Sequence, residues 1–173
     1  MAAGEREEIS WVRDALAGDA RAFRRLYERF GPLVHGVLLA RVARQEVEDL
    51  VQEVFVAAFE KLASLRDPVA FGAWVATIAR TRAVDHGRAS HASVTDGGVE
   101  EIGREDPATL EAKEALAAIR GLPEAYRETL VLRLVEGMTG PEIAERTGLT
   151  PDSVRVNLHR GMALLREALG EER

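Results

Sequence analysis

The chain has 173 residues, a formal net charge of −6 and no cysteine, and 46% of its residues are hydrophobic. This length suits one ordinary domain or two small helical ones, and the hydrophobic fraction is sufficient for a core. The lack of cysteine excludes disulfides and thiolate metal sites. No apolar run approaches a membrane span, and residues 1–10 lack the basic-then-apolar order of a secretion signal. The sequence therefore predicts a cytoplasmic protein with no membrane contact of its own.

Apolar residues recur at three- and four-residue spacing through the first 90 residues, which is typical of helices. Residues 8–17 form a first predicted helix, and Asp19 caps a longer second one, which Gly31-Pro32 is expected to bend or interrupt. A third helix covers about residues 45–64. Its predicted buried stripe contains Val47, Leu50, Val51, Val54, Phe55, Ala58, Phe59 and Leu62. The opposite face of this helix is polar and carries Glu46, Asp49, Gln52, Glu53 and Glu60.

A fourth helix is predicted from Ala70 to about Gly87, with one apolar and one mixed face. The apolar face contains Phe71, Trp74, Val75 and Ile78. Trp74 is interpreted as a core residue because it shares this face, although an aromatic ring near single-stranded DNA could also stack on a base. The mixed face contains Thr77, Arg80, Thr81, Val84 and Arg88. Such a face fits a nucleic-acid backbone or plain solvent equally well.

Residues 89–108 break the helical pattern, because Gly, Ser, Asp and Glu dominate there. From Val94 to Glu111, six carboxylates stand against the single base Arg104, so most of the net negative charge lies in this stretch. The pattern predicts a flexible acidic linker at residues 91–108 between two helical domains, residues 1–90 and 109–173. Composition alone fits an ordinary tether.

Helical spacing resumes at Thr109, first to about Ile119 and then from Glu124 to Val135, where Tyr126, Leu130 and Leu134 are expected in the core. Residues 139–166 then predict a helix-turn-helix. Gly140-Pro141 opens a short helix, Gly148 supplies the tight turn, and Thr150-Pro151-Asp152 starts a second helix. No segment shows strand-like alternation, so we expect an all-α fold. The four histidines have no metal-ligand spacing, and no metal site or other cofactor is predicted.

The second helix of this motif places Val154, Leu158, Gly161 and Leu165 on its inner side. Its outer side carries Asp152, Val156, His159, Arg160 and Ala163, flanked by Arg155 and Arg166. Arginine can bind phosphate or donate two hydrogen bonds to guanine, and valine can contact a thymine methyl group. The outer side therefore indicates either DNA recognition or a solvated helix with scattered arginines.

Four segments, in this order, resemble bacterial sigma factors of the extracytoplasmic-function group of the sigma-70 family. They are EDLVQEVFVAAFEKL (residues 48–62), FGAWVATIARTRAVDHGR (71–88), IRGLPEAYRETLVLRLVEGMT (119–139) and the helix-turn-helix itself. The resemblance implies a two-domain subunit that binds core RNA polymerase, recognises minus-thirty-five and minus-ten promoter elements, and assists promoter melting. It implies no enzymatic activity of the chain alone. It also implies an anti-sigma protein as a further partner.

The resemblance also assigns roles to residues. The polymerase-binding helix would use Asp49, Gln52 and Glu53 against a basic coiled coil of the largest polymerase subunit. The non-template strand of the minus-ten element would contact Arg80, Thr81, Asp85 and Arg88, and the following loop, residues 88–93, would hold a flipped base. The minus-thirty-five duplex would contact Arg155, Val156, His159 and Arg160. Asp85 could instead pair locally with Arg82 or Arg88.

Three positions depart from the usual family pattern. Val156 and Asn157 stand where serine and arginine are common, and Thr81 stands where asparagine is frequent. The departures affect which promoter sequence the chain would recognise more than whether it acts as a sigma factor. Two rival functions remain compatible with the residues: a stand-alone helix-turn-helix regulator, and a sigma-like adaptor that binds polymerase without initiating transcription.

Overall fold

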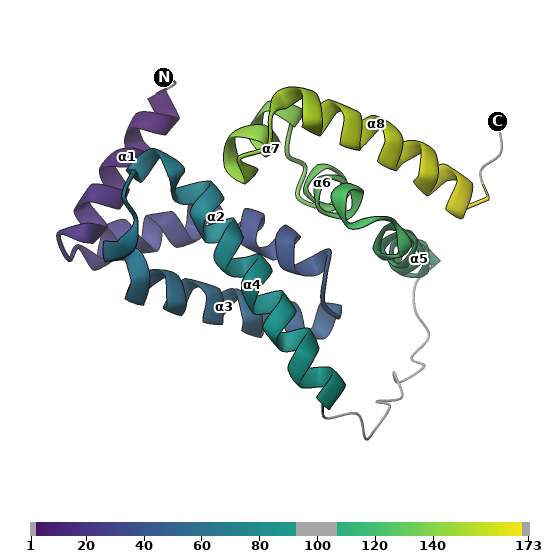
Figure 1. The fold of residues 1–173 in the computed structure, drawn as a ribbon, viewed down its shortest axis with the longest axis horizontal. Helices are drawn as coiled ribbons and strands as arrows, with labels where there is room; N and C mark the ends of the chain where they lie inside the picture. Colours follow the sequence, from purple (N-terminus) through teal and green to yellow (C-terminus); the bar gives the residue numbers. More distant parts are fainter. Residues whose placement is uncertain (1–2, 93–106, 171–173) are drawn as a thin grey trace.

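The computed structural model describes residues 3–92 and 107–170, and all regular structure in these ranges is helical (Figure 1). The N-terminal helices are α1 (Ala3–Leu16), α2 (Ala20–Leu39), α3 (Arg44–Lys61) and α4 (Phe71–Ala92), with short 3₁₀ turns at Leu62–Ser64 and Pro68–Ala70. The C-terminal helices are α5 (Pro107–Gly121), α6 (Glu124–Leu134), α7 (Gly140–Thr147) and α8 (Pro151–Ala168). The predicted all-α fold is confirmed. No helix in the described ranges combines the length and the apolar character that crossing a membrane requires.

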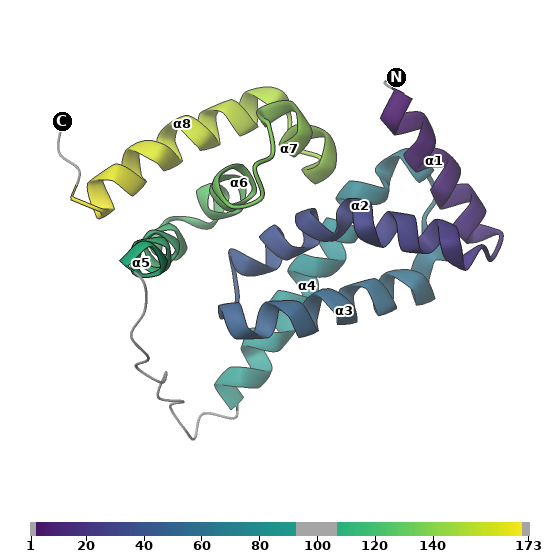
Figure 2. The same ribbon diagram turned by 180° about the vertical axis from the view of Figure 1, so that it is seen from behind.

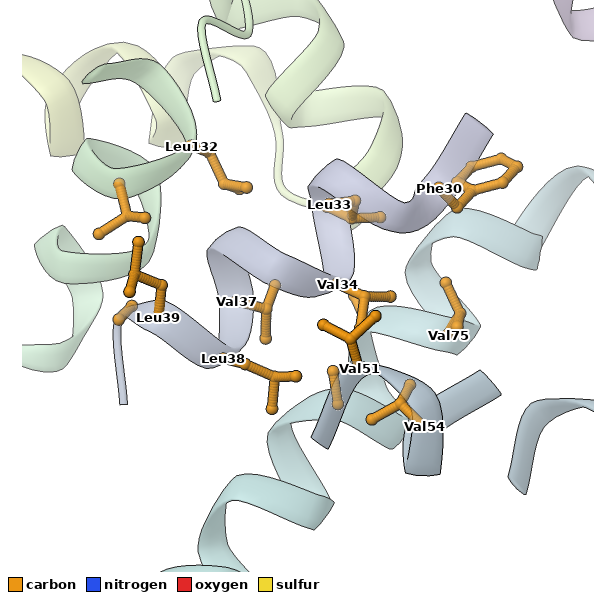
Figure 3. Close-up of a cluster of buried hydrophobic side chains, with 14 of the residues drawn as sticks. Phe30, Leu33, Val34, Val37, Leu38, Leu39, Val51, Val54, Val75 and Leu132 are labelled. Atoms are coloured by element: carbon orange, nitrogen blue, oxygen red, sulfur yellow. The ribbon is translucent and has the colours of Figure 1, made fainter. Parts of the chain in front are cut away.

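Helix α2 is the centre of the N-terminal helices and packs against α1, α3 and α4. Its fully buried residues meet Val51 and Val54 of α3 and Val75 of α4 (Figure 3). Asp19 caps the helix as predicted, because its carboxylate accepts a hydrogen bond from the Arg21 amide at 2.8 Å. The expected interruption at Gly31-Pro32 is wrong, since α2 continues through Pro32 to Leu39. The residue before a proline is normally pushed out of the helix by its own Cβ, and Gly31 has none.

Two other boundaries differ from the sequence prediction. Helix α1 begins at Ala3 rather than residue 8, and α4 continues past Gly87 to Ala92. The loop predicted after Arg88 is therefore helical as far as Ala92, because a single glycine costs a helix only about 1 kcal/mol and alanine-rich sequence follows it. The predicted linker falls mainly on residues 93–106, which lie outside the described part of the chain.

The predicted helix-turn-helix is present as α7 and α8. Thr139 and Glu142 cap each other's backbone amides at the start of α7, and Gly148 ends it with a left-handed φ of 76°. Thr150 caps α8 by accepting from the Ser153 amide at 3.2 Å. These caps satisfy amides that no helical carbonyl can reach. They set where α7 begins and ends and where α8 begins.

Helix α6 corrects one core prediction. Leu134 was expected in the core but is 48% exposed, whereas Leu130, Val131 and Leu132 are all fully buried. Three consecutive buried residues cannot lie on one face of a helix, so α6 must be covered on more than one side. One side is covered by α8 and the other by α2.

The C-terminal helices pack directly on the N-terminal helices, α6 against α2 and α7 against α4 (Figures 1 and 2). Leu132 of α6 points toward α2 at this contact (Figure 3). The close approach depends on Gly36, because a Cβ there would lie only 2.6 Å from Leu132 Cδ2 and 2.9 Å from Glu136 Cγ. The sequence predicted two helical units but did not indicate that they pack on each other. We call this packing of the C-terminal helices on the N-terminal helices the closed arrangement.

Candidate polymerase and nucleic-acid surfaces

The polar face of α3 is open to solvent. Asp49, Gln52 and Glu53 are all exposed, and none of them forms an ion pair or side-chain hydrogen bond within the described residues. Three free polar groups on one face, two of them carboxylates, suit an arginine-rich partner, because guanidinium groups form strong charge-assisted hydrogen bonds to carboxylates. The structure thus brings together the three residues that the sequence assigned to polymerase binding.

Two apolar side chains extend this surface, and the sequence misassigned one of them. Val56 is 59% exposed, and Phe59, which was predicted in the core, is 56% exposed. The Phe59 ring packs edge-to-face with Phe23, at a centroid distance of 5.0 Å, and leaves more than half of its side chain open to solvent. The one-turn spacing of Val56 from Gln52 and Glu53 places it on the same side of α3. We call this combined acidic and apolar region the α3 surface.

Three of the four residues predicted to contact the minus-ten strand lie on the outside of α4. Thr81, Asp85 and Arg88 are exposed. The Thr81 hydroxyl donates to the Thr77 carbonyl at 3.0 Å, so it remains available as an acceptor. In the described part of the chain Asp85 pairs with neither Arg82 nor Arg88, and the local ion pair considered from the sequence does not form.

Arg80, the fourth residue, is instead bound to the C-terminal helices. Its Nε and Nη2 atoms donate to the two carboxylate oxygens of Glu128 on α6, at 3.0 and 2.6 Å. Arg41, at the end of α2, brings a second guanidinium within 2.8 Å of the same carboxylate. Glu128 is only 7% exposed. Two arginines from different N-terminal helices therefore converge on one buried carboxylate, which we call the Glu128 clasp.

The opposite charges of the clasp shift the pKa values of Glu128 and Arg80. Burial alone would raise the pKa of Glu128, but the hydrogen bonds and positive charges of Arg80 and Arg41 outweigh it and hold the pKa below its ordinary value. The hydrogen bond to Glu128 likewise raises the pKa of Arg80. Glu128 and Arg80 are therefore both charged at neutral pH. No local sequence signal marks Glu128, because its partners stand far away in the chain.

Two further arginines of the C-terminal helices donate hydrogen bonds to backbone carbonyls in the N-terminal part of the chain. Arg120 of α5 donates to the carbonyls of Leu39 and Val42 at 3.0 and 2.6 Å, which satisfies acceptors at the end of α2. Arg146 of α7 donates to the Arg29 carbonyl at 3.2 Å and lies 5.4 Å from the centre of the Phe30 ring. The closed arrangement thus combines apolar packing with specific polar contacts.

A histidine also joins the two sets of helices. The Nδ1 atom of His35 on α2 lies 2.6 Å from a carboxylate oxygen of Glu136, which follows α6. This hydrogen bond raises the pKa of His35 above its ordinary value of 6.5, against the opposing effect of burial. Glu48, 3.8 Å from Nε2, adds to the rise, and the charge of Arg44 reduces it.

We expect the closed arrangement to weaken as pH rises. A group whose pKa is raised by folding stabilises fully below its unfolded value, and this stabilisation is lost as pH rises through the folded value. The chain has no cysteine, so fluorophores on cysteines introduced at the exposed Ala63 and Ala168 can report the separation by energy transfer. Transfer should fall as the pH rises above the ordinary histidine value of 6.5 and through the raised pKa of His35. The His35→Gln variant should lose this dependence; an unchanged profile in that variant would show that another group is responsible.

The recognition surface of α8 faces solvent. Val154, Gly161 and Leu165 are buried against the other C-terminal helices, as predicted, and Leu158 is half-buried. The opposite side presents the predicted minus-thirty-five residues Arg155, Val156, His159 and Arg160, all exposed. Asp152 pairs with Arg155 at 3.1 Å, but both side chains are more than three-quarters exposed, so the pair is weak. The closed arrangement leaves this surface free while it engages Arg80 on α4.

Metal binding has no candidate site in the part of the chain that the structure describes. Groups of three or more potential histidine, aspartate or glutamate ligands do not occur there.

Comparisons with known proteins agree with this division of surfaces. The family model "Sigma-70 region 2" matches residues 26–92, and the model "Sigma-70, region 4" matches residues 112–165. The first match contains the α3 surface and the exposed side of α4, and the second contains α8 and the clasp residue Glu128. The two matches together span most of the described chain.

Individual relatives match over nearly the whole length. The chain is 36% identical to the ECF RNA polymerase sigma factor ShbA of Streptomyces griseus, covering 93% of this chain and 94% of that protein. It is 34% identical to the RNA polymerase sigma factor CarQ of Myxococcus xanthus, covering 89% and 92%. Among solved structures, CnrH in complex with the cytosolic domain of CnrY is 27% identical, with a TM-score of 0.69 over 96% of this chain and 99% of that one. The chain therefore belongs to the extracytoplasmic-function sigma factors of the sigma-70 family.

Proposed function

We propose that this sigma factor binds core RNA polymerase through the α3 surface, contacts the minus-ten element through α4, and contacts the minus-thirty-five element through α8. The observation that carries the proposal is the separation of three chemically distinct exposed surfaces on one helical scaffold. The α3 surface is acidic and apolar, the α4 surface carries arginine, threonine and aspartate, and the α8 surface is mainly cationic. The division into domains 1–90 and 109–173, with a linker at 91–108, belongs to the same proposal.

The proposed role of the α3 surface follows from its free charges. Within the described residues Asp49 and Glu53 have no ion pair or side-chain hydrogen bond to give up, so a basic helix gains their full attraction on binding. Val56 and Phe59 add apolar area that is removed from water in the same contact. Gln52 lies between the two carboxylates and can both donate and accept hydrogen bonds.

The proposed role of α4 is to favour the separated strands at the minus-ten element. Extruding a base costs a few kcal/mol, and contacts that exist only with the single strand can offset this cost without ATP. Arg88 and Arg80 supply charge for the strand backbone, while Thr81 and Asp85 offer hydrogen-bonding groups to bases. The chain then acts by binding energy alone, and the catalytic step belongs to the polymerase.

Replacing Arg160 with alanine should weaken recognition of the minus-thirty-five element. If Arg160 donates to a guanine edge, the loss should be about 1–3 kcal/mol for the preferred sequence and much smaller for others. If it contacts a phosphate, all sequences should weaken about equally. Binding of the polymerase complex to a randomised upstream element, followed by sequencing of the bound fraction, separates these outcomes. Arg166→Ala, at the flank of the same face, is the matched control.

An anti-sigma protein is a further proposed partner of this chain. The solved structure of CnrH contains the cytosolic domain of CnrY, and that of the sigma factor RpoE from Bartonella quintana contains the anti-sigma factor NepR. We propose that this chain is likewise held inactive by an anti-sigma protein. We also propose that it acts in the cytoplasm, where bacterial transcription takes place.

A gel-shift experiment tests the proposed function against the rival of a stand-alone regulator. The chain is incubated with its promoter DNA in the presence and absence of core polymerase. Stable specific binding should require the polymerase, because the closed arrangement and the acidic net charge weaken binding by the chain alone. Tight, specific binding without polymerase would favour the regulator.

A further inference from the structure

The Glu128 clasp contains a pair of guanidinium groups that belongs entirely to the N-terminal helices. Arg41 stands at the end of α2 and Arg80 in the middle of α4, and these two helices pack directly on each other. Arg41 is also anchored to its own helix, because its Nη1 atom donates to the Val37 carbonyl at 2.9 Å. Both arginines therefore remain with the N-terminal helices wherever the C-terminal helices lie, and the Arg41 side chain keeps its anchor at Val37. The carboxylates that they bind both come from α6: Glu128 lies between the two arginines, and Glu124 Oε1 accepts a longer hydrogen bond of 3.3 Å from Arg41 Nη2.

The guanidinium groups of Arg41 and Arg80 converge on one point, and an anion between them offsets their repulsion. Arg80 donates twice to Glu128, at 2.6 and 3.0 Å, and Arg41 lies 2.8 Å away. Without the carboxylate, the two guanidinium groups would repel each other at a half-buried position. Their geometry suits any anion with several acceptor oxygens, and a phosphate diester presents the same chemistry as a carboxylate to arginine.

We propose that Arg41 and Arg80 form a binding site for one backbone phosphate of the promoter strand, and that Glu128 occupies this site as a phosphate mimic in the closed form. The proposal rests on the proposed role of α4 at the minus-ten element. It adds Arg41 as a DNA-contacting residue, which no pattern in the sequence indicated. Glu128 and the phosphate then compete for the same two arginines. DNA cannot occupy this site on α4 while the C-terminal helices are closed on it.

The closed form is therefore self-inhibited at the minus-ten surface and not at the minus-thirty-five surface. The residues of α8 remain exposed while Arg80 and Arg41 are engaged. Separation of α6 from α2 frees the arginine pair and moves α8 away from α4. Binding to polymerase can then convert the closed form to the open one if it holds the two sets of helices apart.

The test compares binding of a fluorescent thymidine oligonucleotide of about 20 nucleotides, which offers phosphates without a preferred sequence. The full chain is used as wild type, Glu128→Gln, and Glu128→Gln combined with Arg41→Gln. Glutamine keeps the size of Glu128 but removes the charge that competes with phosphate. We expect Glu128→Gln to bind at least about fivefold tighter than wild type, because two cationic groups become available to the strand.

The double variant distinguishes a phosphate site from a simple clasp. If Arg41 binds phosphate, adding Arg41→Gln to Glu128→Gln should remove most of the gain and reduce the slope of log affinity against log salt by about 0.7. If Arg41 only holds Glu128, the double variant should bind as tightly as Glu128→Gln. The matched control combines Glu128→Gln with Arg21→Gln, which removes an exposed arginine from the other end of α2. Its effect should be clearly smaller than that of Arg41→Gln.

A second variant that separates the C-terminal helices keeps the proposal testable if Glu128→Gln does not fold. Gly36→Leu separates α6 from α2 by steric conflict and leaves every charge of the clasp in place. It should also raise oligonucleotide affinity, and Arg41→Gln should reverse that rise. No gain in either opened variant, or equal effects of Arg41→Gln and Arg21→Gln, would overturn the proposal. Transcription by wild type with core polymerase is measured separately, so failure of the proposed function is distinguishable from failure of the phosphate site.

Discussion

Replacing Asp49 and Glu53 together with lysine is expected to abolish binding to core polymerase while leaving the fold intact. Both side chains are exposed and make no contact that the N-terminal helices need. Each reversal removes an attraction and adds a repulsion, and close charge pairs at interfaces contribute about 1.5–7 kcal/mol each. Affinity should therefore fall by at least about 100-fold, which corresponds to roughly 2.7 kcal/mol. Titration of labelled protein with core enzyme measures this loss.

The matched control for this double variant places lysines on the same helix away from the α3 surface. Glu46 faces His86, 2.9 Å away, and is unsuitable, so Gln45→Lys combined with Arg44→Lys is used instead: it places two lysines at the start of α3 and adds one positive charge. Circular dichroism and thermal unfolding should be unchanged in both variants. Wild-type affinity in the Asp49 and Glu53 variant would exclude the α3 surface as the polymerase contact.

Replacing Gly36 with leucine is expected to separate the C-terminal helices from the N-terminal ones. Even a Cβ at this position lies 2.6 Å from Leu132 Cδ2, so a leucine side chain has no space between α2 and α6. Leucine also favours a helix over glycine by about 0.8–1.0 kcal/mol, so α2 itself should not be weakened. The undocked form loses the burial of Leu132, worth about 1.5–3 kcal/mol, and the ordered contacts of Arg120 and Arg146.

Energy transfer between fluorophores at positions 63 and 168 reports this separation. Transfer should drop strongly in Gly36→Leu and broaden into a distribution of distances. Gly87→Leu is the control, because α4 has open space around Gly87 and the substitution brings the same gain in helix propensity. Unchanged transfer in Gly36→Leu would show that the close contact of α2 and α6 does not hold the chain closed.

Local chemistry explains which parts of the fold could be predicted from sequence. The caps of Asp19, Thr139 and Thr150 and the left-handed turn at Gly148 depend on residues within a few positions of one another. Helical periodicity separates an outer face from an inner one, and the resemblance to sigma factors then assigned roles to residues of the outer faces. Pro32 was misjudged because the relief provided by Gly31 and the packing around α2 outweigh the general rule against proline in helices.

The contacts between distant segments could not be predicted in the same way. Glu128 and its partners Arg41 and Arg80 are separated by 87 and 48 positions, so no periodic pattern connects them. The exposure of Phe59 depends on which neighbouring helices cover the end of α3, which periodicity does not encode. The single glycine at position 36 that admits Leu132 appears in the sequence as one more small residue. These features arise from packing of whole helices rather than from local preference.

The account as a whole is tested most directly by reconstituted run-off transcription. Purified core polymerase is supplied with a promoter of this sigma factor on a linear template, with and without the chain. We predict a discrete transcript that requires the chain, is lost in the Asp49 and Glu53 double lysine variant, and is initiated without ATP-driven melting. Binding to polymerase with no transcript would contradict the account and would identify the chain as a sigma-like adaptor.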